Sequence, residues 1–347
     1  MEPNHTLRFR RRRVGYNRGV LPVAPPTVFP PAGRWTPATP ACVATVGNFD
    51  GVHVGHAAIV RRLVEMAGRL GVPAVVLTFD PHPAAILRPG AAPVPLTTPA
   101  RRAELLLALG ADAVLVQPVD ERLVAIGAEE FYAGVLRGRL GVRGLVEGAD
   151  FRFGAGRRGT VALLADLCGA DGVELATVAA VERGAAAVSS SRVRALLAAG
   201  RVAEAGPLLT SPYRCTGDVV AGARRGRTLG FPTANLAAIA TLVPGPGVYA
   251  CRATVAGAGI VRPAAVHVGP NVSFGETTTS VEAHLVGFDG DLYGHTLHVD
   301  FLDRVRETRR FDSAADLARQ LASDVERVRA VAAPVAESTT IGSVHAT

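Results

Sequence analysis

The sequence predicts a doubly wound parallel α/β sheet domain followed by a small antiparallel β-barrel with a C-terminal helix. Three observations predict this class. Between residues 41 and 205, short β-rich apolar runs alternate with helical segments of about a dozen residues, which is typical of βαβ units. After about Pro212 the helical period stops, and strand candidates separated by turns follow. A single amphipathic segment then closes the patterned part of the chain at residue 331.

The sheet domain is predicted to start with a buried strand over residues 42–46 and a helix over residues 55–70. In that helix an apolar stripe recurs at helical spacing, on the face opposite the charged residues; it consists of Ile59, Leu63, Met66 and Leu70. Further strands are expected at residues 74–79, 113–117, 145–147 and 175–179. Helices are expected to centre near residues 104, 133, 164 and 195. The alternation of the two element types predicts helices on both faces of one sheet.

The barrel domain is predicted from strands at residues 217–220, 248–255, 281–288 and 296–301. Within 281–285, apolar residues alternate with Glu282 and His284, so this strand is expected to be buried on one face only. The closing helix carries its apolar side chains on one face: Leu317, Leu321, Val325 and Val328. The predicted domains are therefore 41–205 and 206–331, and residues 332–347 are expected to be a disordered tail.

Charge is concentrated at the N-terminus. The chain of 347 residues has a formal net charge of +7, and residues 1–40 alone contain seven arginines against one acidic residue. Prolines are dense between residues 22 and 40 and prevent regular helix or sheet pairing, so residues 1–40 are predicted to be disordered. A nucleic-acid-binding arm is the alternative. Because the remainder is nearly neutral and contains no lysine, no nucleic-acid partner is expected.

Other compositional features exclude membrane and secreted classes. No run of about 20 apolar residues and no signal-peptide pattern are present, so no membrane partner is expected. The four cysteines include no CxxC pair, which argues against a disulfide scaffold or a structural zinc site. We therefore expect a protein of the reducing cytoplasm, with at most weak homo-oligomerisation.

The first chemical motif covers residues 47–56, Gly-Asn-Phe-Asp-Gly-Val-His-Val-Gly-His, where the first strand turns into the first helix. Open α/β sheets bind ligands at the carboxyl ends of their strands, and a helix N-terminus presents free N–H groups to phosphate. His53 and His56 are candidates for donating hydrogen bonds to a phosphate that gains charge; a pair of surface histidines is the alternative. The phosphate-binding candidates are Gly47, Asn48, Phe49, Asp50, Gly51 and Gly55.

The second motif covers residues 188–194, Val-Ser-Ser-Ser-Arg-Val-Arg, again where a loop enters a helix. The hydroxyls of Ser189 and Ser190 and the guanidinium groups of Arg192 and Arg194 suit the β- and γ-phosphates of a nucleotide. An ordinary serine N-cap is the alternative. In this order the two motifs resemble the nucleotidyltransferase superfamily, which transfers AMP from ATP through HxGH and SSxxxR signatures.

Longer matches narrow the resemblance. Class I aminoacyl-tRNA synthetases pair HxGH with a lysine-rich loop, which a chain without lysine excludes. Phosphopantetheine and nicotinamide mononucleotide adenylyltransferases usually end at the sheet domain. Residues 47–53, 78–83 (Thr-Phe-Asp-Pro-His-Pro) and 147–154 (Glu-Gly-Ala-Asp-Phe-Arg-Phe-Gly) resemble the prokaryotic bifunctional riboflavin kinase and FAD synthetase family. The resemblance implies catalytic roles for His53, His56 and Arg192, and flavin contacts for Asp80, His82, Asp150 and Phe151.

The barrel half carries a glycine-rich basic loop that runs into Pro-Thr-Ala-Asn at residues 232–235. Such a loop could wrap an ATP polyphosphate, with Gly222, Arg227 and Gly230 as candidates. Thr233 and Asn235 offer hard oxygen ligands suited to Mg²⁺. Glycine and arginine turns are common in barrels, so the loop alone is weak evidence. With the segments 247–249, 281–285, 290–294 and 306–311 in that order, it resembles the riboflavin kinase module.

That resemblance implies that Glu282 is the general base and that Arg306 contacts flavin. Without the resemblance, Glu282 would be interpreted as a solvated strand residue. Two segments depart from the family pattern. Residues 267–274, His-Val-Gly-Pro-Asn-Val-Ser-Phe, replace the usual Asn-x-Gly-x-x-Pro-Thr-Phe, so Val272 and Ser273 differ. Thr308 stands where the family usually has a glutamate.

The resemblance implies a two-step enzyme that phosphorylates riboflavin to FMN and then transfers AMP from ATP to FMN, giving FAD and pyrophosphate, with Mg²⁺ as cofactor. Flavins and ATP are the expected partners. One alternative is an enzyme with FMN adenylyltransferase activity alone and an impaired kinase module. The other is a non-catalytic nucleic-acid-binding regulator on the same scaffold.

Overall fold

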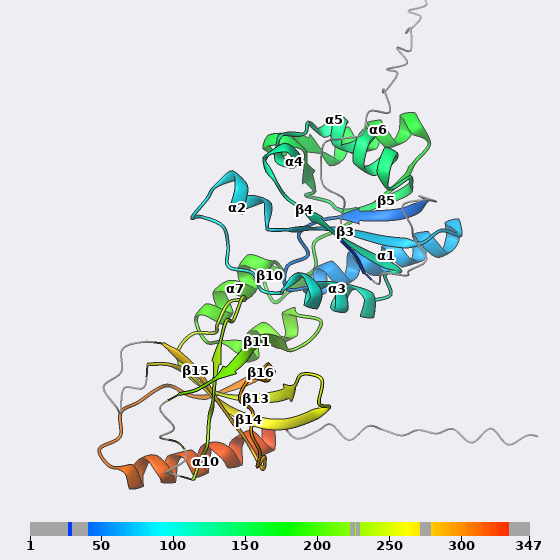
Figure 1. Cartoon of the computed structure of the whole chain (residues 1–347). Coiled ribbons are helices and arrows are strands. Elements are labelled where there is room, and N and C mark those ends of the chain that lie inside the picture. Colours follow the sequence, from blue (N-terminus) through cyan, green and yellow to red (C-terminus); the bar gives the residue numbers. More distant parts are fainter. Residues whose placement is uncertain (1–26, 30–40, 223–225, 227–229, 271–278, 333–347) are drawn as a thin grey trace, which may run out of the picture.

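The structure is a computed structural model, and it describes residues 27–29, 41–222, 226, 230–270 and 279–332. It contains two domains, with a parallel sheet in one and a closed barrel in the other (Figure 1). Helix α7 (Ser190–Ala198) lies between them. Within the described residues, no helix has the length and apolarity that crossing a bilayer requires.

The sheet has the order β1-β4-β3-β2-β5-β8. Its strands are β1 (Thr27–Phe29), β2 (Cys42–Val46), β3 (Ala74–Asp80), β4 (Ala113–Pro118), β5 (Val142–Gly148) and β8 (Glu174–Val178). All neighbours pair in parallel except β1, which is antiparallel to β4. The chain runs from β2 through β3 to β4 and then crosses to β5 on the other side of β2. The topological switch point, where such sheets bind ligands, therefore lies between β2 and β5.

Helices cover both faces of this sheet, as the doubly wound prediction requires (Figure 1). Helices α1 (Val54–Leu70) and α3 (Pro99–Ala108) pack on one face. Helices α4 (Glu121–Ala125), α5 (Ala128–Glu130) and α6 (Val161–Asp171), with the π-helix η1 (Phe131–Arg139), pack on the other. Every residue of β2 is buried, because both of its faces are covered.

Short elements complete the sheet domain. They are α2 (Pro83–Leu87), β6 (Arg152–Phe153), η2 (Ala155–Arg157), β7 (Gly159–Thr160), β9 (Glu182–Arg183), β10 (Ala186–Ala187), α8 (Val202–Ala205) and η3 (Gly206–Leu208).

The second domain is a closed antiparallel barrel of order β11-β12-β15-β14-β13-β16, with helix α10 packed against its outside. Its elements are β11 (Tyr213–Val220), β12 (Ala234–Ala237), β13 (Gly247–Val255), β14 (Ile260–Gly269), β15 (Ser280–Leu285), β16 (Thr296–Arg306) and α10 (Ala314–Ala332). In β15 buried and partly buried residues alternate, as predicted.

The structure corrects two predictions about the chain ends. Residues 27–29 lie in the segment predicted to be disordered, yet their Thr-Val-Phe sequence forms β1 on the open edge of β4. β-branched and aromatic side chains favour strands, which explains this pairing between flanking prolines. Ala332 was assigned to a disordered tail but ends α10 with only 1% of its surface exposed. The other residues predicted to be disordered, 1–26, 30–40 and 333–347, lie outside the described residues.

Two barrel strands, β12 and β14, were not predicted. β14 contains Pro263, which argues against a central strand, and β12 is only four residues long. The predicted strand over residues 281–288 ends earlier, at Leu285, because a turn follows in which Gly287 has a φ of +69°.

The two domains share a hydrophobic core. Val193 and Leu197 of α7 belong to the same buried cluster as Tyr249 and Phe301 of the barrel. A main-chain hydrogen bond also connects the domains: the Leu242 N–H donates to the Pro95 carbonyl at 2.8 Å. The predicted boundary at residues 205 and 206 therefore lies inside a continuous core.

Candidate active sites

The loop that follows β2 carries the first motif in a strained backbone conformation. Phe49 and Val52 have φ angles of +47° and +38°, which L-residues rarely adopt. Gly51 has a φ of +80°, and a Cβ there would lie 2.8 Å from Leu96. Strain of this kind persists only where surrounding contacts impose it. The loop is therefore held in shape by its neighbours.

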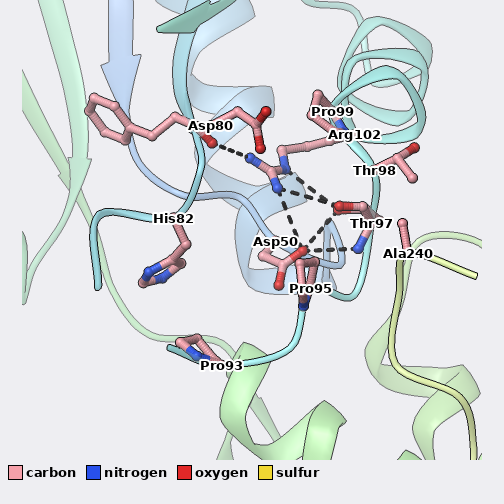
Figure 2. Close-up of a pocket in the computed structure, with 11 residues that line it drawn as sticks. Asp50, Asp80, His82, Pro93, Pro95, Thr97, Thr98, Pro99, Arg102 and Ala240 are labelled. Carbon is pink, nitrogen blue, oxygen red and sulfur yellow. Dashed lines mark hydrogen bonds and ion pairs between the residues drawn. The ribbon is translucent and has the colours of Figure 1, made fainter. Parts of the chain in front are cut away.

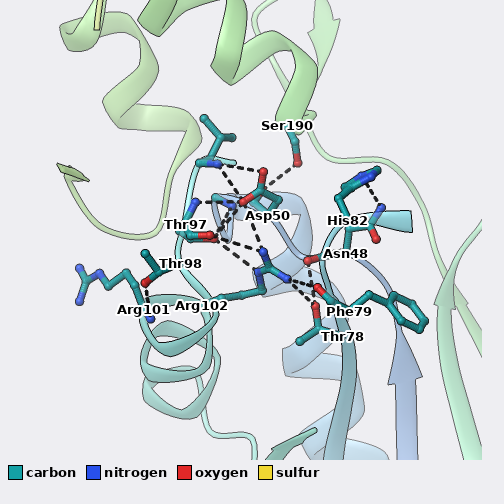
Figure 3. Close-up of polar contacts among 12 residues, drawn as sticks. Asn48, Asp50, Thr78, Phe79, His82, Thr97, Thr98, Arg101, Arg102 and Ser190 are labelled. Carbon is teal, nitrogen blue, oxygen red and sulfur yellow. Dashed lines mark hydrogen bonds and ion pairs between the residues drawn. The ribbon is translucent and has the colours of Figure 1, made fainter. Parts of the chain in front are cut away.

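Asp50 is the centre of those contacts (Figure 3). Its carboxylate is 3% exposed and accepts hydrogen bonds from Leu96 N, Thr97 N and Thr97 Oγ1, each at 3.0 Å. It also pairs with the guanidinium groups of Arg194 and Arg102. A carboxylate so engaged ties the loop to the segment before α3. Its predicted contact with phosphate stays a prediction.

Arg102 is a buried cation that sequence reasoning missed. It is 5% exposed and donates to Thr78 Oγ1 at 3.0 Å and to the Phe79 carbonyl at 2.9 Å. Burial lowers the pKa of Arg102, and the neighbouring Asp50 opposes that shift. One sequence signal was present, since Arg102 lies four residues before Leu106 on the buried face of α3.

His53 and His56 form a reciprocal cap at the start of α1. His53 Nδ1 accepts from His56 N at 3.2 Å, and His56 Nδ1 accepts from His53 N at 3.3 Å. Their rings stack with centroids 3.5 Å apart, and Gly55 leaves room because a Cβ there would lie 3.1 Å from the His53 ring. His53 is 7% exposed, so the surface-histidine alternative is wrong for it.

The same geometry sets the protonation state of the pair. Burial lowers the pKa of His53 to about 4 and lowers the pKa of His56 well below its ordinary value. Both rings are therefore neutral at pH 7. Because each Nδ1 accepts a main-chain hydrogen bond, the single ring proton lies on Nε2. The pair can present two uncharged N–H donors to a ligand.

The second motif contacts the first. Ser190 Oγ donates to the Asp50 carbonyl at 2.8 Å (Figure 3). Ser189 is the N-cap of α7, accepting from Arg192 N at 3.2 Å, so the capping alternative describes what its hydroxyl does here. Arg192 donates to the carbonyls of Arg183 and Ala186. Their phosphate contacts stay predictions.

A pocket opens beside Asp50, between the sheet and a barrel loop (Figure 2). Its lining includes the flavin candidates Asp80 and His82, the missed residue Arg102, and Ala240 of the second domain. His82 Nε2 lies 2.9 Å from the side-chain amide nitrogen of Asn48. Burial, with Arg194 nearby, lowers the pKa of His82. The structure thus places one predicted flavin pair next to the first motif.

The other predicted flavin pair is not in this lining. Asp150 is exposed just beyond β5, and the ring of Phe151 stacks on Phe153 with centroids 5.5 Å apart. Their flavin contacts stay predictions.

The barrel brings the kinase candidates together. Glu282 stands opposite Asn235 on one side and opposite His267 on the other. Thr233 Oγ1 donates to Glu282 Oε2 at 3.3 Å, and Ser280 Oγ donates to Oε1 at 3.1 Å. The predicted base and the predicted metal ligands therefore adjoin one another.

The glycine-rich loop approaches the same place. A Cβ on Gly222 would lie 2.1 Å from Asn235 Nδ2, so a larger residue there would displace the Asn235 side chain. Gly230 has a φ of +83°, which favours glycine. Arg227 lies outside the described residues, as do Val272 and Ser273.

Arg306 has a partner other than a ligand. It forms a bidentate ion pair with Asp324 of α10, whose carboxylate is 1% exposed, with Nε at 2.9 Å from Oδ2. Arg306 therefore fastens α10 to β16, and its flavin contact stays a prediction. Thr308 is partly buried, and nothing in the structure assigns it a function.

Comparisons with known proteins agree with this division. Residues 36–192 match the FAD synthetase family model, and residues 209–332 match the riboflavin kinase model. Bifunctional riboflavin kinase/FMN adenylyltransferase from Pseudomonas fluorescens is 40% identical over 85% of this chain and 94% of its own length. The Escherichia coli K12 protein of the same name is 35% identical over 82% and 90%.

A solved structure described as a macrolide-efflux protein from Streptococcus pneumoniae has a TM-score of 0.76 and 33% identity, over 86% of this chain and 97% of that one. That likeness covers both domains in one chain. The family models and the curated relatives together show that this chain belongs to the bifunctional riboflavin kinase/FMN adenylyltransferase family.

Proposed function

We propose that the barrel phosphorylates riboflavin with ATP and that the sheet domain transfers AMP from ATP to the resulting FMN, releasing pyrophosphate. The observation that carries the proposal is that one chain holds both constellations, each inside the family model that names its activity. The neutral histidine pair lies in the first, and Glu282 with Thr233 and Asn235 lies in the second.

In the kinase step, Glu282 accepts the proton of the ribityl 5′-hydroxyl as that oxygen attacks the γ-phosphorus of ATP. The bond from the γ-phosphorus to the bridging oxygen breaks, and ADP leaves. Ser280 and Thr233 donate to the two carboxylate oxygens and hold Glu282 in place.

A magnesium ion fits the chemistry of this site. Mg²⁺ is usually held by one or two carboxylates together with substrate phosphates. Thr233 and Asn235 offer a hydroxyl and an amide oxygen to the ion, next to the carboxylate of Glu282. Across the described ranges, no group of three or more His, Cys, Asp or Glu is placed to hold a metal ion. When bound, it would neutralise charge on the transferring phosphoryl group.

In the adenylyl step, an oxygen of the FMN phosphate attacks the α-phosphorus of ATP and pyrophosphate departs. FMN is itself the nucleophile, so catalysis consists of positioning and charge stabilisation. His53 and His56 donate their Nε2 protons to the phosphate oxygens that gain charge. Arg192 and the N-terminus of α7 face the same phosphates.

Two single variants test this division of labour. Purified protein is supplied with riboflavin, ATP and Mg²⁺, or with FMN, ATP and Mg²⁺, and both flavin products are quantified by chromatography. Glu282→Gln should lower FMN formation by about 10² or more because it removes the proton acceptor. His56→Ala should lower FAD formation from FMN by about 10² because it removes a donor to the transition state.

Each variant serves as the control for the other, since each activity should stay near the parent rate when the opposite domain is changed. A folded variant that loses both activities would contradict the two-site assignment. A parent that adenylylates FMN but never phosphorylates riboflavin would favour the enzyme with adenylyltransferase activity alone.

A further inference from the structure

The segment that joins the two domains contacts the histidine loop directly. Leu209 forms an isolated antiparallel bridge with His53. Thr210 donates twice to the carbonyl of Val52, from its hydroxyl at 2.7 Å and from its main-chain N–H at 3.3 Å. Both residues lie within 209–332, the part of the chain that the riboflavin kinase model matches. A residue of the kinase half therefore reaches into the proposed adenylyl site.

The contacted carbonyl belongs to the peptide group that precedes the histidine pair. The N–H of that same peptide, on His53, donates to His56 Nδ1 at 3.3 Å. Thr210 thus holds the oxygen side of the Val52–His53 peptide while the ring of His56 holds the nitrogen side. Fixing the plane of this peptide fixes the direction in which the stacked rings present their Nε2 protons.

Val52 needs such a contact. Its φ of +38° is a genuine outlier for a β-branched side chain and persists only where surrounding contacts impose it. Within the loop, Val52 N donates to the Phe49 carbonyl at 3.2 Å, and Phe49 is itself strained. Asp50 and Gly51 are tied to Thr97 within the sheet domain, and Thr210 adds the restraint on the Val52 carbonyl from the other half of the chain.

We propose that Thr210 is a positioning residue for AMP transfer, contributed by the kinase half of the chain to the histidine pair of the other half. This inference rests on the proposed role of His53 and His56. It makes the adenylyl site a product of both domains, so that the sheet domain alone holds an incompletely ordered histidine loop.

The test replaces Thr210 by Val, which keeps the β-branched shape and removes the hydroxyl. We expect the kcat of FAD formation from FMN to fall about tenfold, because small misplacement of catalytic groups is costly, with the KM values for ATP and FMN changed less than about threefold. Thr210→Ser restores the hydroxyl and should restore kcat. Riboflavin phosphorylation should stay within about twofold of the parent in both variants and shows that each is folded.

Ser211 provides a matched control. Its hydroxyl also crosses between the domains, accepting from Arg101 Nη2 at 3.0 Å, but it contacts α3 and not the histidine loop. Ser211→Ala should leave the kcat of FAD formation unchanged. The proposal is overturned if Thr210→Val keeps the parent kcat, or if Ser211→Ala lowers kcat as much as Thr210→Val does.

The His56→Ala variant separates this inference from the proposed function. If His56→Ala loses FAD formation and Thr210→Val does not, the histidine assignment stands and the positioning role falls. If His56→Ala keeps FAD formation, the assignment of the histidine pair falls, and the positioning role falls with it.

Discussion

At the scale of single residues, burial decides what the histidine pair can do. Two protonated imidazoles with ring centroids 3.5 Å apart would repel each other, and both would lose hydration, so the charged forms are disfavoured twice. What remains is a pair of neutral donors whose direction the helix cap fixes. The fixed charge at this end of the sheet comes instead from arginines, among them the buried Arg102.

The sequence identified the histidines and serines because short motifs place them next to glycines and helix starts. It could not identify their protonation state, which depends on neighbours far along the chain. The sequence did not identify Arg102 as a site residue, because it lies on the face of α3 that otherwise carries apolar side chains. Its partner Asp50 is also 52 positions away in the chain. Asp50 was predicted from its motif, but its ties to Leu96 and Thr97 depend on tertiary packing.

The protonation state of Glu147 also depends on tertiary packing, and it can be tested by measuring stability as a function of pH. This β5 residue is 2% exposed and accepts from Val46 N at 2.9 Å, next to the switch point of the sheet. Burial raises the pKa of Glu147 well above its ordinary value. Burial therefore favours the protonated, neutral carboxyl group in the folded protein.

Because the pKa of Glu147 is higher in the folded protein than in the unfolded chain, the unfolded chain releases this proton at a lower pH. The free energy of unfolding should therefore fall by up to about 1.4 kcal/mol per pH unit above about pH 4.5 from this group alone. Glu147→Gln removes that dependence, so its free energy of unfolding in urea, relative to the parent, should increase as the pH rises above about 5. The exposed Glu65→Gln is the control. An equal difference at every pH would show that Glu147 is ionised when folded.

At the scale of elements, the spacing of hydrophobic residues along the sequence predicted most of the helices and most of the long strands. The strands it missed lack a clear local signal: β14 carries Pro263, β12 has four residues, β1 lies among prolines, and β6, β7, β9 and β10 have two residues each. Tertiary pairing forms them instead: β1 pairs with β4, and β12 and β14 each pair with two neighbours in the closed barrel. A helix was predicted near residue 133, but a hydrophobic stripe does not distinguish the π-helix η1 from an α-helix.

Strand β1 offers a test of how much such tertiary pairing contributes to stability. Val28 and Phe29 pack partly against the cores on opposite faces of the sheet, and β1 covers the edge of β4. Deleting residues 1–29 should lower the free energy of unfolding by about 1 kcal/mol relative to deleting residues 1–26, as measured by urea denaturation. The shorter deletion is the reference. Equal stabilities would show that the pairing of β1 contributes nothing to the fold.

At the scale of the whole molecule, the sequence predicted two domains but not the buried cluster that joins α7 and α8 to the barrel. Composition changes near Pro212, yet α7 and α8 (190–205) bury side chains against the barrel. Their close approach depends on glycine, since a Cβ on Gly245 would lie 2.4 Å from the Ala198 carbonyl oxygen. Domain contacts of this kind join residues that are far apart in the chain, so no local sequence pattern predicts them.

The shared core predicts that the two activities are lost together on heating. Leu197 is fully buried in the cluster that joins α7 to the barrel, and its carbonyl accepts from Gly245 N at 2.9 Å. Leu197→Ala removes core volume that both domains use, and such truncations cost about 2–5 kcal/mol. The midpoint temperatures for inactivation of riboflavin phosphorylation and of FMN adenylylation should therefore both fall.

Leu164→Ala is the matched control, because Leu164 is equally buried but lies in the core confined to the sheet domain. It should lower the midpoint for FMN adenylylation whether or not the domains unfold together. The decisive comparison is the kinase midpoint in Leu197→Ala. If that midpoint stays at the parent value while adenylylation fails early, the barrel keeps its stability without α7, and the two domains are independent folding units joined only by the chain.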